Sequence, residues 1–168
     1  GGEGLAEADL QAMPGHIAAA LKTDTAATAI ANGLREIDDV VVVGRGFNYC
    51  SAHELAIKLK ELTYTHAEPY SSADFLHGPI AILDERYRVI AIAPSGPLQT
   101  NQIEFIQRAQ ARGGKVIAIS DNAEILAAAG ERLVLPAGMP EWVSPIAAIV
   151  PGQLLALRLT EARGYSTD

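Results

Sequence analysis

One predicted helix carries a stripe of charged side chains that could move protons. Glu54, Lys58 and Glu61 recur at spacings of four and three residues within segment 48–65, so helical geometry places them on one face. A carboxylate in a cleft can transfer a proton between neighbouring carbon atoms. An ammonium group one turn away can stabilise a developing oxyanion and keep the carboxylate ionised. The alternative is a solvated helix face with ordinary ion pairs, each worth about 0.3–0.5 kcal/mol.

A histidine at a helix stop is a second candidate for proton chemistry. His77 stands directly before Gly78-Pro79, a pair that ends a helix and holds the chain rigidly. A histidine held in this way can relay protons near neutral pH. Alternatively, His77 only complements the dipole at the end of a short helix.

Two turns are candidate substrate contacts. Gly44-Arg45-Gly46 follows a run of four valines and precedes a helix. Glycines there permit a tight turn and a close approach of a ligand to the backbone, and the next helix offers free N–H groups to an anion. The alternative is that Gly44 and Gly46 only make the turn. Ser95, in the turn 94–100 after the second apolar run, is the other candidate for substrate binding.

Several chemistries find no support in the sequence. The histidines at 16, 53 and 66 lack metal-ligand spacing, so we expect no metal and no cofactor. No G-x-S-x-G nucleophile elbow occurs. The net charge of −7, from 13 Lys and Arg against 20 Asp and Glu, argues against nucleic-acid binding. No apolar run approaches the ~20 residues of a membrane span. Cys50, the single cysteine, fits a reducing, cytoplasmic compartment, and we expect it to be buried.

The elements that must position these residues alternate between strands and helices. Apolar runs with β-branched residues predict strands at 40–43, 89–93, 115–119 and 132–135, as in sheets buried on both faces. Helix-length segments separate or follow them at 48–65, 98–112, 123–129 and 147–162. This order predicts an α/β fold with a doubly wound parallel sheet and helices on both faces. Such sheets bind ligands beyond the carboxyl ends of their strands.

The N-terminal part is predicted to be helical but interrupted. The polar segment 5–13 is followed by Pro14-Gly15, which predicts a break, and the Ala-rich segments 17–21 and 25–34 favour helix. We therefore divide the chain into a helical lead-in, 1–36, and a domain, 37–168. The chain begins at Gly1 without a methionine, and we expect it to be a piece of a longer protein.

Four sequence blocks, in a fixed order, carry a resemblance to a known family. The block A-I-K-L-K-E at 56–61 is followed by H-G-P at 77–79, with Gly44-Arg45-Gly46 before it and Ala67-Glu68-Pro69-Tyr70 between. In this order the blocks resemble the SIS (sugar isomerase) domain family. The likeness is to the second SIS domain of glucosamine-6-phosphate synthases and of related amino-sugar-phosphate deaminases. It implies a three-layer αβα sandwich around a five-stranded parallel sheet.

The resemblance also implies roles for individual residues. Glu61 takes the place of the base that moves a proton between sugar carbons 1 and 2, and Lys58 that of the lysine near the reacting end. His77 matches a histidine that assists ring opening in a neighbouring subunit's site, which implies a homodimer. The turn 94–100 keeps few hydroxyl groups, so we expect a preceding SIS domain to hold the phosphate.

The implied function is the interconversion of glucosamine 6-phosphate and fructose 6-phosphate. The enzyme would be either a deaminase/isomerase or the isomerase half of a synthase, and the isolated fragment would be inactive. The alternative is a regulatory SIS module that binds a sugar phosphate without catalysis. The glutamate of the K-L-K-E block favours the enzyme.

Overall fold

A single parallel sheet forms the centre of the computed structural model, which describes residues 7–166. Its five strands are hydrogen-bonded in the order β2-β1-β3-β4-β5. Their bounds are β1 Asp39–Gly44, β2 His66–Ser71, β3 Arg88–Ile92, β4 Lys115–Ser120 and β5 Glu131–Val134. All four neighbouring pairs run parallel, with Val41 beside Val89 and Val89 beside Val116. The doubly wound α/β fold predicted from the sequence is confirmed.

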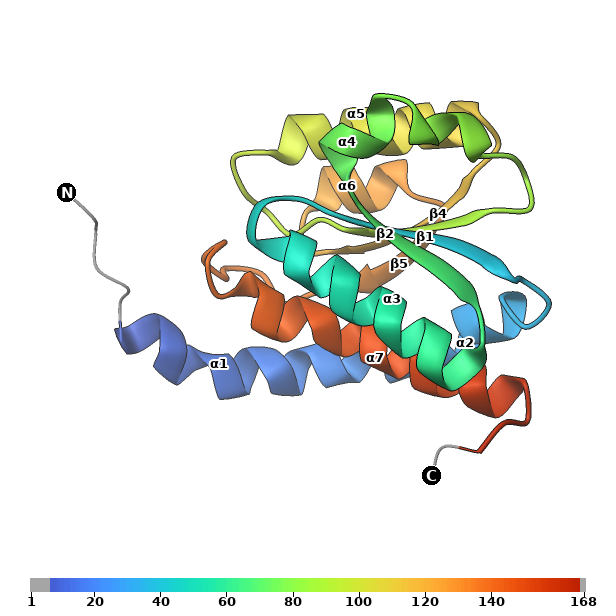
Figure 1. Ribbon diagram of the computed structural model, residues 1–168. Helices are drawn as coiled ribbons and strands as arrows, with labels where there is room; N and C mark the ends of the chain where they lie inside the picture. Colours follow the sequence, from blue (N-terminus) through green and yellow to red (C-terminus); the bar gives the residue numbers. More distant parts are fainter. Residues whose placement is uncertain (1–6, 167–168) are drawn as a thin grey trace.

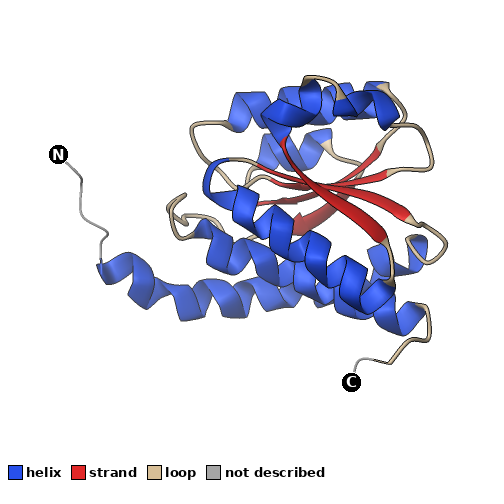
Figure 2. Cartoon of the chain, viewed as in Figure 1, coloured by secondary structure: helices blue, strands red, loops and turns tan. Residues whose placement is uncertain are grey.

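Helices cover both faces of the sheet and complete three layers (Figure 1, Figure 2). One face carries the helices α1 (Glu7–Ala20), α2 (Asp24–Gly33), α3 (Tyr49–Thr63) and α7 (Ser144–Ala162). The other face carries α4 (Ser72–Leu76), α5 (Gln99–Ala111) and α6 (Ala123–Ala128). Short 3₁₀ turns at Leu21–Thr23, Gly46–Asn48 and Pro79–Ile82 connect some of these elements.

The alternation of side chains along β1 divides the core in two. Val40 and Val42 pack with residues of α2, α3 and α7, whereas Val41 and Val43 pack with residues of α4, α5 and α6. The four valines are at most 1% exposed. Residues buried on both sides of a strand are what an unbroken β-branched run predicts.

The predicted lead-in packs into the same core. Ala27 and Ala31 of α2 are fully buried and belong to the cluster that includes α7. Arg158 of α7 donates two hydrogen bonds, of 2.7 and 2.8 Å, to the carboxylate of Asp24. The helix α2 is therefore held by both apolar packing and an ion pair.

Three details differ from the sequence-based expectations. The strand β2 contains Pro69 and lies outside the four strands predicted from the apolar runs. A proline is tolerated on an edge strand because its missing N–H can face away from the neighbouring strand. Helix α1 runs through Pro14, on an exposed part of the surface where water can reach the carbonyl group that lacks a donor. Cys50 is exposed, and its Sγ lies 3.0 Å from the carbonyl oxygen of Phe47, so the expectation that it is buried was wrong.

Candidate active site

The carboxylate and the ammonium group singled out in the sequence form an ion pair. The Nζ atom of Lys58 donates to Oε2 of Glu61 at 2.9 Å. The Lys58 and Glu61 side chains are 35% and 57% exposed, so the pair lies at the surface. The hydrogen bond from Lys58 to Glu61 raises the pKa of the Lys58 ammonium, and the charges of Glu61 and Glu54 act in the same direction. The ammonium group therefore remains charged at neutral pH.

The buried face of α3 fixes the direction in which this pair points. Leu55 and Leu59 are fully buried in the core cluster that includes α7. The side chain of Leu55 packs against α7 so closely that a Cβ atom at Gly152 would lie 2.8 Å from one of its methyl groups. The polar stripe with Glu61 consequently faces away from the sheet.

The C-terminal end of α3, next to Glu61, is held by an arginine that the sequence analysis did not identify. Arg163 follows α7, and its side chain is only 7% exposed. Its guanidinium donates hydrogen bonds to the carbonyl oxygens of Arg35, Ile37 and Thr63 and to the hydroxyl of Thr65. It thus joins the end of α3 to the segments before β1 and β2. No sequence motif indicated this role, because the acceptors are mostly backbone atoms of distant segments.

His77 lies on the other face of the sheet. It caps the C-terminal end of α4, and Gly78, with φ of 156°, leads from it into Pro79. The side chain borders a pocket of about 240 Å³, which is also lined by Arg45, Ser72, Ala73, Leu76, Asn101, Glu104 and Arg108. Because α3 and α4 belong to opposite layers, the sheet separates Glu61 from His77 within one chain.

The glycines of the first candidate turn have a clear structural role. A Cβ atom at Gly44 would lie 2.2 Å from the carbonyl oxygen of Asn48. Only glycine therefore allows the turn that follows β1 to pack this closely against the backbone at position 44. Gly46 has φ of +58°, in the left-handed region that glycine adopts readily. Arg45, between them, has a half-buried side chain that reaches the pocket beside His77.

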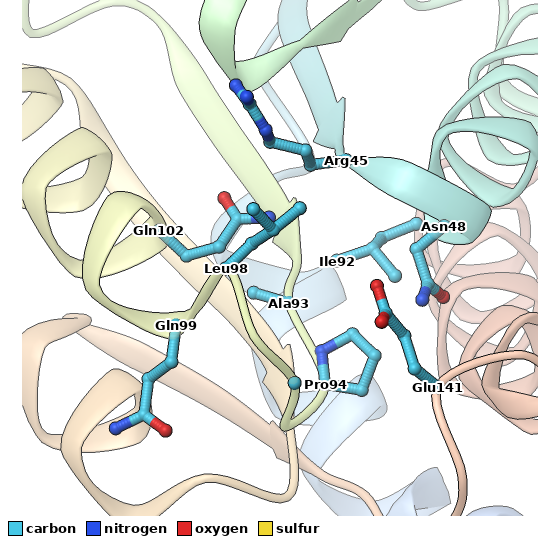
Figure 3. Close-up of a pocket in the computed structure, with 10 residues that line it drawn as sticks. Arg45, Asn48, Ile92, Ala93, Pro94, Leu98, Gln99, Gln102 and Glu141 are labelled. Carbon is cyan, nitrogen blue, oxygen red and sulfur yellow. The ribbon is translucent and has the colours of Figure 1, made fainter.

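A second, smaller pocket lies where β1 and β3 end (Figure 3). It encloses about 10 Å³, enough for one water-sized molecule. Its lining consists of Arg45, Asn48, Ile92, Ala93, Pro94, Gly96, Leu98, Gln99, Gln102 and Glu141. Sequence reasoning found Arg45 among these residues but missed Gln102 and Glu141, since both reach the pocket from segments far along the chain.

Ser95 is beside this pocket, with its backbone N–H already engaged. That N–H donates to Oδ1 of Asp121 at 2.6 Å. The pocket lining includes Gly96 but not Ser95. The carboxyl edge of the sheet is therefore surrounded by the predicted substrate contacts Gly44, Arg45, Gly46 and Ser95. Glu61 and Lys58 are not among the residues at this edge and lie on α3.

Residues 7–166 contain neither a metal-binding cluster nor a helix that could cross a membrane. Within residues 7–166, no three His, Cys, Asp or Glu side chains converge in a way that could hold a metal ion. Of the helices in this range, none combines the length and apolar character that a membrane crossing requires.

Comparison with known proteins identifies related chains. The sequence profile of the SIS domain family matches residues 33–160. The isomerizing glutamine–fructose-6-phosphate aminotransferase of Sphingobium yanoikuyae is 43% identical over 143 residues, which cover 83% of this chain and 91% of that sequence. The enzyme of the same name from Zymomonas mobilis is 40% identical over 162 residues, which cover 95% of this chain and 26% of that one.

A solved structure shows the same arrangement of elements. The C-terminal domain of glucosamine-fructose-6-phosphate aminotransferase from Francisella tularensis superimposes with a TM-score of 0.88 at 30% sequence identity. The match covers 96% of this chain and 46% of that structure. The present chain thus spans about a quarter of the Zymomonas relative and just under half of the Francisella structure.

Proposed function

Because this chain belongs to the SIS domain family, we propose that it is the isomerase part of an enzyme acting on amino-sugar phosphates. The reaction is the interconversion of fructose 6-phosphate and glucosamine 6-phosphate. The observation that carries the proposal is the 2.9 Å ion pair between Lys58 and Glu61. The names of the relatives, isomerizing glutamine–fructose-6-phosphate aminotransferases, support the choice of substrate.

The proposed chemistry is a proton transfer between two sugar carbons. In the direction of synthesis, the open-chain ketose carries an imine nitrogen at C2. Glu61 removes a proton from C1, the nitrogen gains a proton, and an enolamine forms. Glu61 then returns its proton to C2 while the C1 hydroxyl loses one, which gives the aldehyde of the amino sugar. In the direction of deamination the steps reverse to the C2 imine, and water then hydrolyses this imine, which releases ammonia and leaves the C2 carbonyl of fructose 6-phosphate.

Lys58 has two roles in this scheme. Its ammonium group donates a hydrogen bond to Glu61, and this bond holds the carboxylate in one orientation for proton transfer. The same positive charge can stabilise the negative charge that develops on the C1 oxygen. The raised pKa of Lys58 suits an electrostatic role, because a group that stays protonated does not compete as a base.

We propose further that the active unit is a homodimer in which His77 opens the sugar ring in the partner's site. The separation of α3 and α4 on opposite faces of the sheet supports this assignment. A single chain cannot bring Glu61 and His77 to one substrate, whereas two copies related by a two-fold axis can exchange these residues reciprocally.

The remaining parts of the site are proposed to come from a preceding SIS domain. The chain spans only 26% of the Zymomonas relative, and the half-exposed Glu61 needs another surface to exclude water from the substrate. A preceding domain would supply that surface and the phosphate contacts. On this proposal the enzyme works in the cytoplasm, and the isolated fragment is inactive.

Replacement of the base in the full-length protein tests the proposal. Glu61→Gln keeps the shape of the side chain but removes the base, so we expect kcat to fall by a factor of about 10²–10⁴. The melting temperature should stay unchanged, because the side chain is half exposed. Glu36→Gln, at a 91% exposed carboxylate, is the matched control and should retain full activity. Normal turnover by the Glu61 variant would overturn the assignment.

The same protein can be tested for the alternative of a regulatory module. Calorimetry measures the binding of glucosamine 6-phosphate, and an ammonia assay measures its deamination. Binding by the wild type without any isomerisation or ammonia release would favour the non-catalytic module and contradict the proposed enzyme.

Complementation between two inactive variants tests the shared site. In a heterodimer of Glu61→Gln and His77→Asn, one site would contain both native residues and the other neither. Random mixing makes about half of the dimers heterodimers, so activity should recover to about a quarter of the wild-type value. If mixing restores no activity although the subunits exchange, the two residues do not serve sites in different subunits.

A further inference from the structure

The pocket beside His77 lies where β1 and β2 end. These two strands are paired in register, with Gly44 of β1 beside Ser71 of β2. Arg45 and Ser72 are the residues that follow this pair, and both line the pocket. Because neighbouring strands lie about 4.8 Å apart, the sheet places the starts of the two turns side by side. Two segments that are distant in the sequence therefore contribute to one pocket.

Helices α4 and α5 form the walls of this pocket. The rings of Phe75 in α4 and Phe105 in α5 are fully buried, and their centroids are 5.9 Å apart, so the two helices are packed against each other. Asn101, Glu104 and Arg108 of α5 line the pocket. They lie on one face of α5, because residues three or four apart on a helix are neighbours. The cavity of about 240 Å³ is therefore bounded by packed elements.

Arg45 brings an unpaired positive charge to this pocket. Its side chain is half-buried, and its guanidinium has neither a hydrogen-bond acceptor nor an ion-pair partner among residues 7–166. Figure 3 shows this guanidinium extending away from the carboxylate of Glu141. A partly buried charge without a partner is unfavourable, and a guanidinium can bind a phosphate through two parallel hydrogen bonds. An anion in the pocket would supply the missing acceptors.

A buried hydroxyl group in the pocket lining also lacks a partner. Ser72 is 1% exposed, and its Oγ atom forms no hydrogen bond within residues 7–166. A serine hydroxyl can rotate and donate one hydrogen bond. Leaving such a group unpaired destabilises a folded protein, and a ligand that accepts its proton removes this cost.

The charges around the pocket favour an anion over a cation. Arg45 and Arg108 contribute positive charge, and Glu104 is the single carboxylate of the lining. Glu104 is paired with Arg108 at 2.6 Å. Two arginines against one glutamate give the lining a net charge of +1 when His77 is neutral. An adjoining pocket of about 360 Å³, which shares Arg108, adds Arg112 and has no carboxylate in its lining.

We propose that the pocket beside His77 binds the phosphate group of a small phosphate ester. Arg45 donates two parallel hydrogen bonds to the phosphate, the Ser72 hydroxyl donates a third, and Arg108 contributes positive charge. The cavity is larger than one phosphate ion and leaves room for the carbon part of the ester. The ion pair of α3 does not line this pocket, so the site is independent of the proposed proton transfer.

Titrations of the 168-residue chain with phosphate compounds test the site. The chain has its own buried core on both faces of the sheet, and its use alone excludes phosphate contacts from a preceding domain. Calorimetry with inorganic phosphate, fructose 6-phosphate and unphosphorylated fructose is done at an ionic strength held constant with sodium chloride. We expect one site per chain for both phosphate compounds, a lower Kd for the ester, and no binding of fructose. At ten times its Kd, the ester should raise the melting temperature by roughly 3–6 °C.

Four variants separate the site from other effects. Arg45→Met removes the guanidinium and should raise the Kd by roughly 10- to 100-fold, whereas Arg35→Met makes the same change at a 62% exposed side chain and should not alter it. Ser72→Ala should raise the Kd by about two- to tenfold. It should also leave the melting temperature without phosphate unchanged or higher, because it removes an unpaired buried hydroxyl. Glu61→Gln should bind phosphate as the wild type does, whether or not Glu61 is the base.

Several results would contradict the proposal. The site does not exist if neither phosphate compound binds, or if fructose binds as tightly as fructose 6-phosphate. A wild-type Kd in folded Arg45→Met, checked by circular dichroism, refutes the role of the guanidinium. Should that variant fail to fold, a wild-type Kd in Ser72→Ala refutes the site instead. Tighter binding of inorganic phosphate than of fructose 6-phosphate contradicts the assignment to an ester.

Discussion

Removing the guanidinium of Arg163 should strongly destabilise the domain, because this charged group is almost fully buried. The substitution Arg163→Met keeps most of the apolar stem of a side chain that is only 7% exposed. It deletes the donors for Thr63 and Thr65, which are 0% and 1% exposed, and for Arg35 and Ile37, which water can reach. A hydrogen bond from a charged donor contributes about 1.5–3 kcal/mol.

Counting only the two buried acceptors at that value gives the expected loss. The Thr63 and Thr65 hydroxyls remain bonded to each other at 2.7 Å, so part of the pairing survives. We therefore expect the free energy of unfolding to fall by about 3–5 kcal/mol, a large part of the 5–15 kcal/mol typical of a domain. With a urea m-value of about 2 kcal/mol/M, the unfolding midpoint should fall by roughly 1.5–2.5 M.

Urea unfolding followed by far-UV circular dichroism and by the fluorescence of the single tryptophan, Trp142, measures this change. Arg35→Met is the control, because that side chain is 62% exposed and its ion pair with Glu36 is 3.8 Å long. Its removal should cost at most about 0.5 kcal/mol. A loss below about 1 kcal/mol for Arg163→Met, or one equal to the control, would refute the idea that Arg163 fastens the end of α3.

Four further outcomes follow from the structure. Gly44→Ala should destabilise the domain by about 3 kcal/mol or more, measured by urea unfolding, because its Cβ atom would lie 2.2 Å from the carbonyl oxygen of Asn48. Gly33→Ala, where a Cβ atom meets nothing within 4 Å, should be neutral or stabilising by up to about 1 kcal/mol. The hydrogen bonds from Arg158 lower the pKa of Asp24 below its ordinary value of 3.8. The ion pair with Asp24 therefore contributes fully to stability above pH 3.8, and this contribution is lost as the pH falls through the lowered pKa. Asp24→Asn should make stability less dependent on pH in that acid range, and an unchanged slope of stability against pH would contradict the ion pair. Lys58→Met in the full-length protein should lower kcat by about 10²–10³ without changing the melting temperature, and normal turnover in a coupled assay of product formation would exclude the electrostatic role.

Local sequence patterns were sufficient to predict most of the elements. The valine run of β1 and the apolar runs of β3 and β4 are buried on both faces, and such runs have few alternatives to the centre of a parallel sheet. The charged stripe of α3 was equally predictable, because residues three or four apart on a helix are neighbours whatever surrounds them. The Lys58–Glu61 ion pair is a result of that spacing.

Elements that depend on distant neighbours were missed or misjudged. The strand β2 contains a proline and carries only partly buried residues along most of its length, so no local pattern marked it. It is a strand because the exposed edge of β1 offers a partner from Asp39 to Gly44. The burial of Cys50 was misjudged for a similar reason, since helical position alone does not tell which side of α3 faces α7.

The sequence by itself determined the layered α/β fold and the presence of a carboxylate beside an ammonium group, and it predicts the carboxyl edge of the sheet as the place for ligands. These follow from periodicity and spacing, which are short-range properties of the chain. Only the tertiary structure decided that Glu61 and His77 lie on opposite faces of the sheet. It also brought Arg163 to the end of α3 and placed Asn48, Gln102 and Glu141 around one small pocket. The reason is physical, because these relations depend on how crossover connections pack helices on either face of the sheet. They also depend on backbone carbonyl groups, which every residue carries and which a sequence therefore does not distinguish.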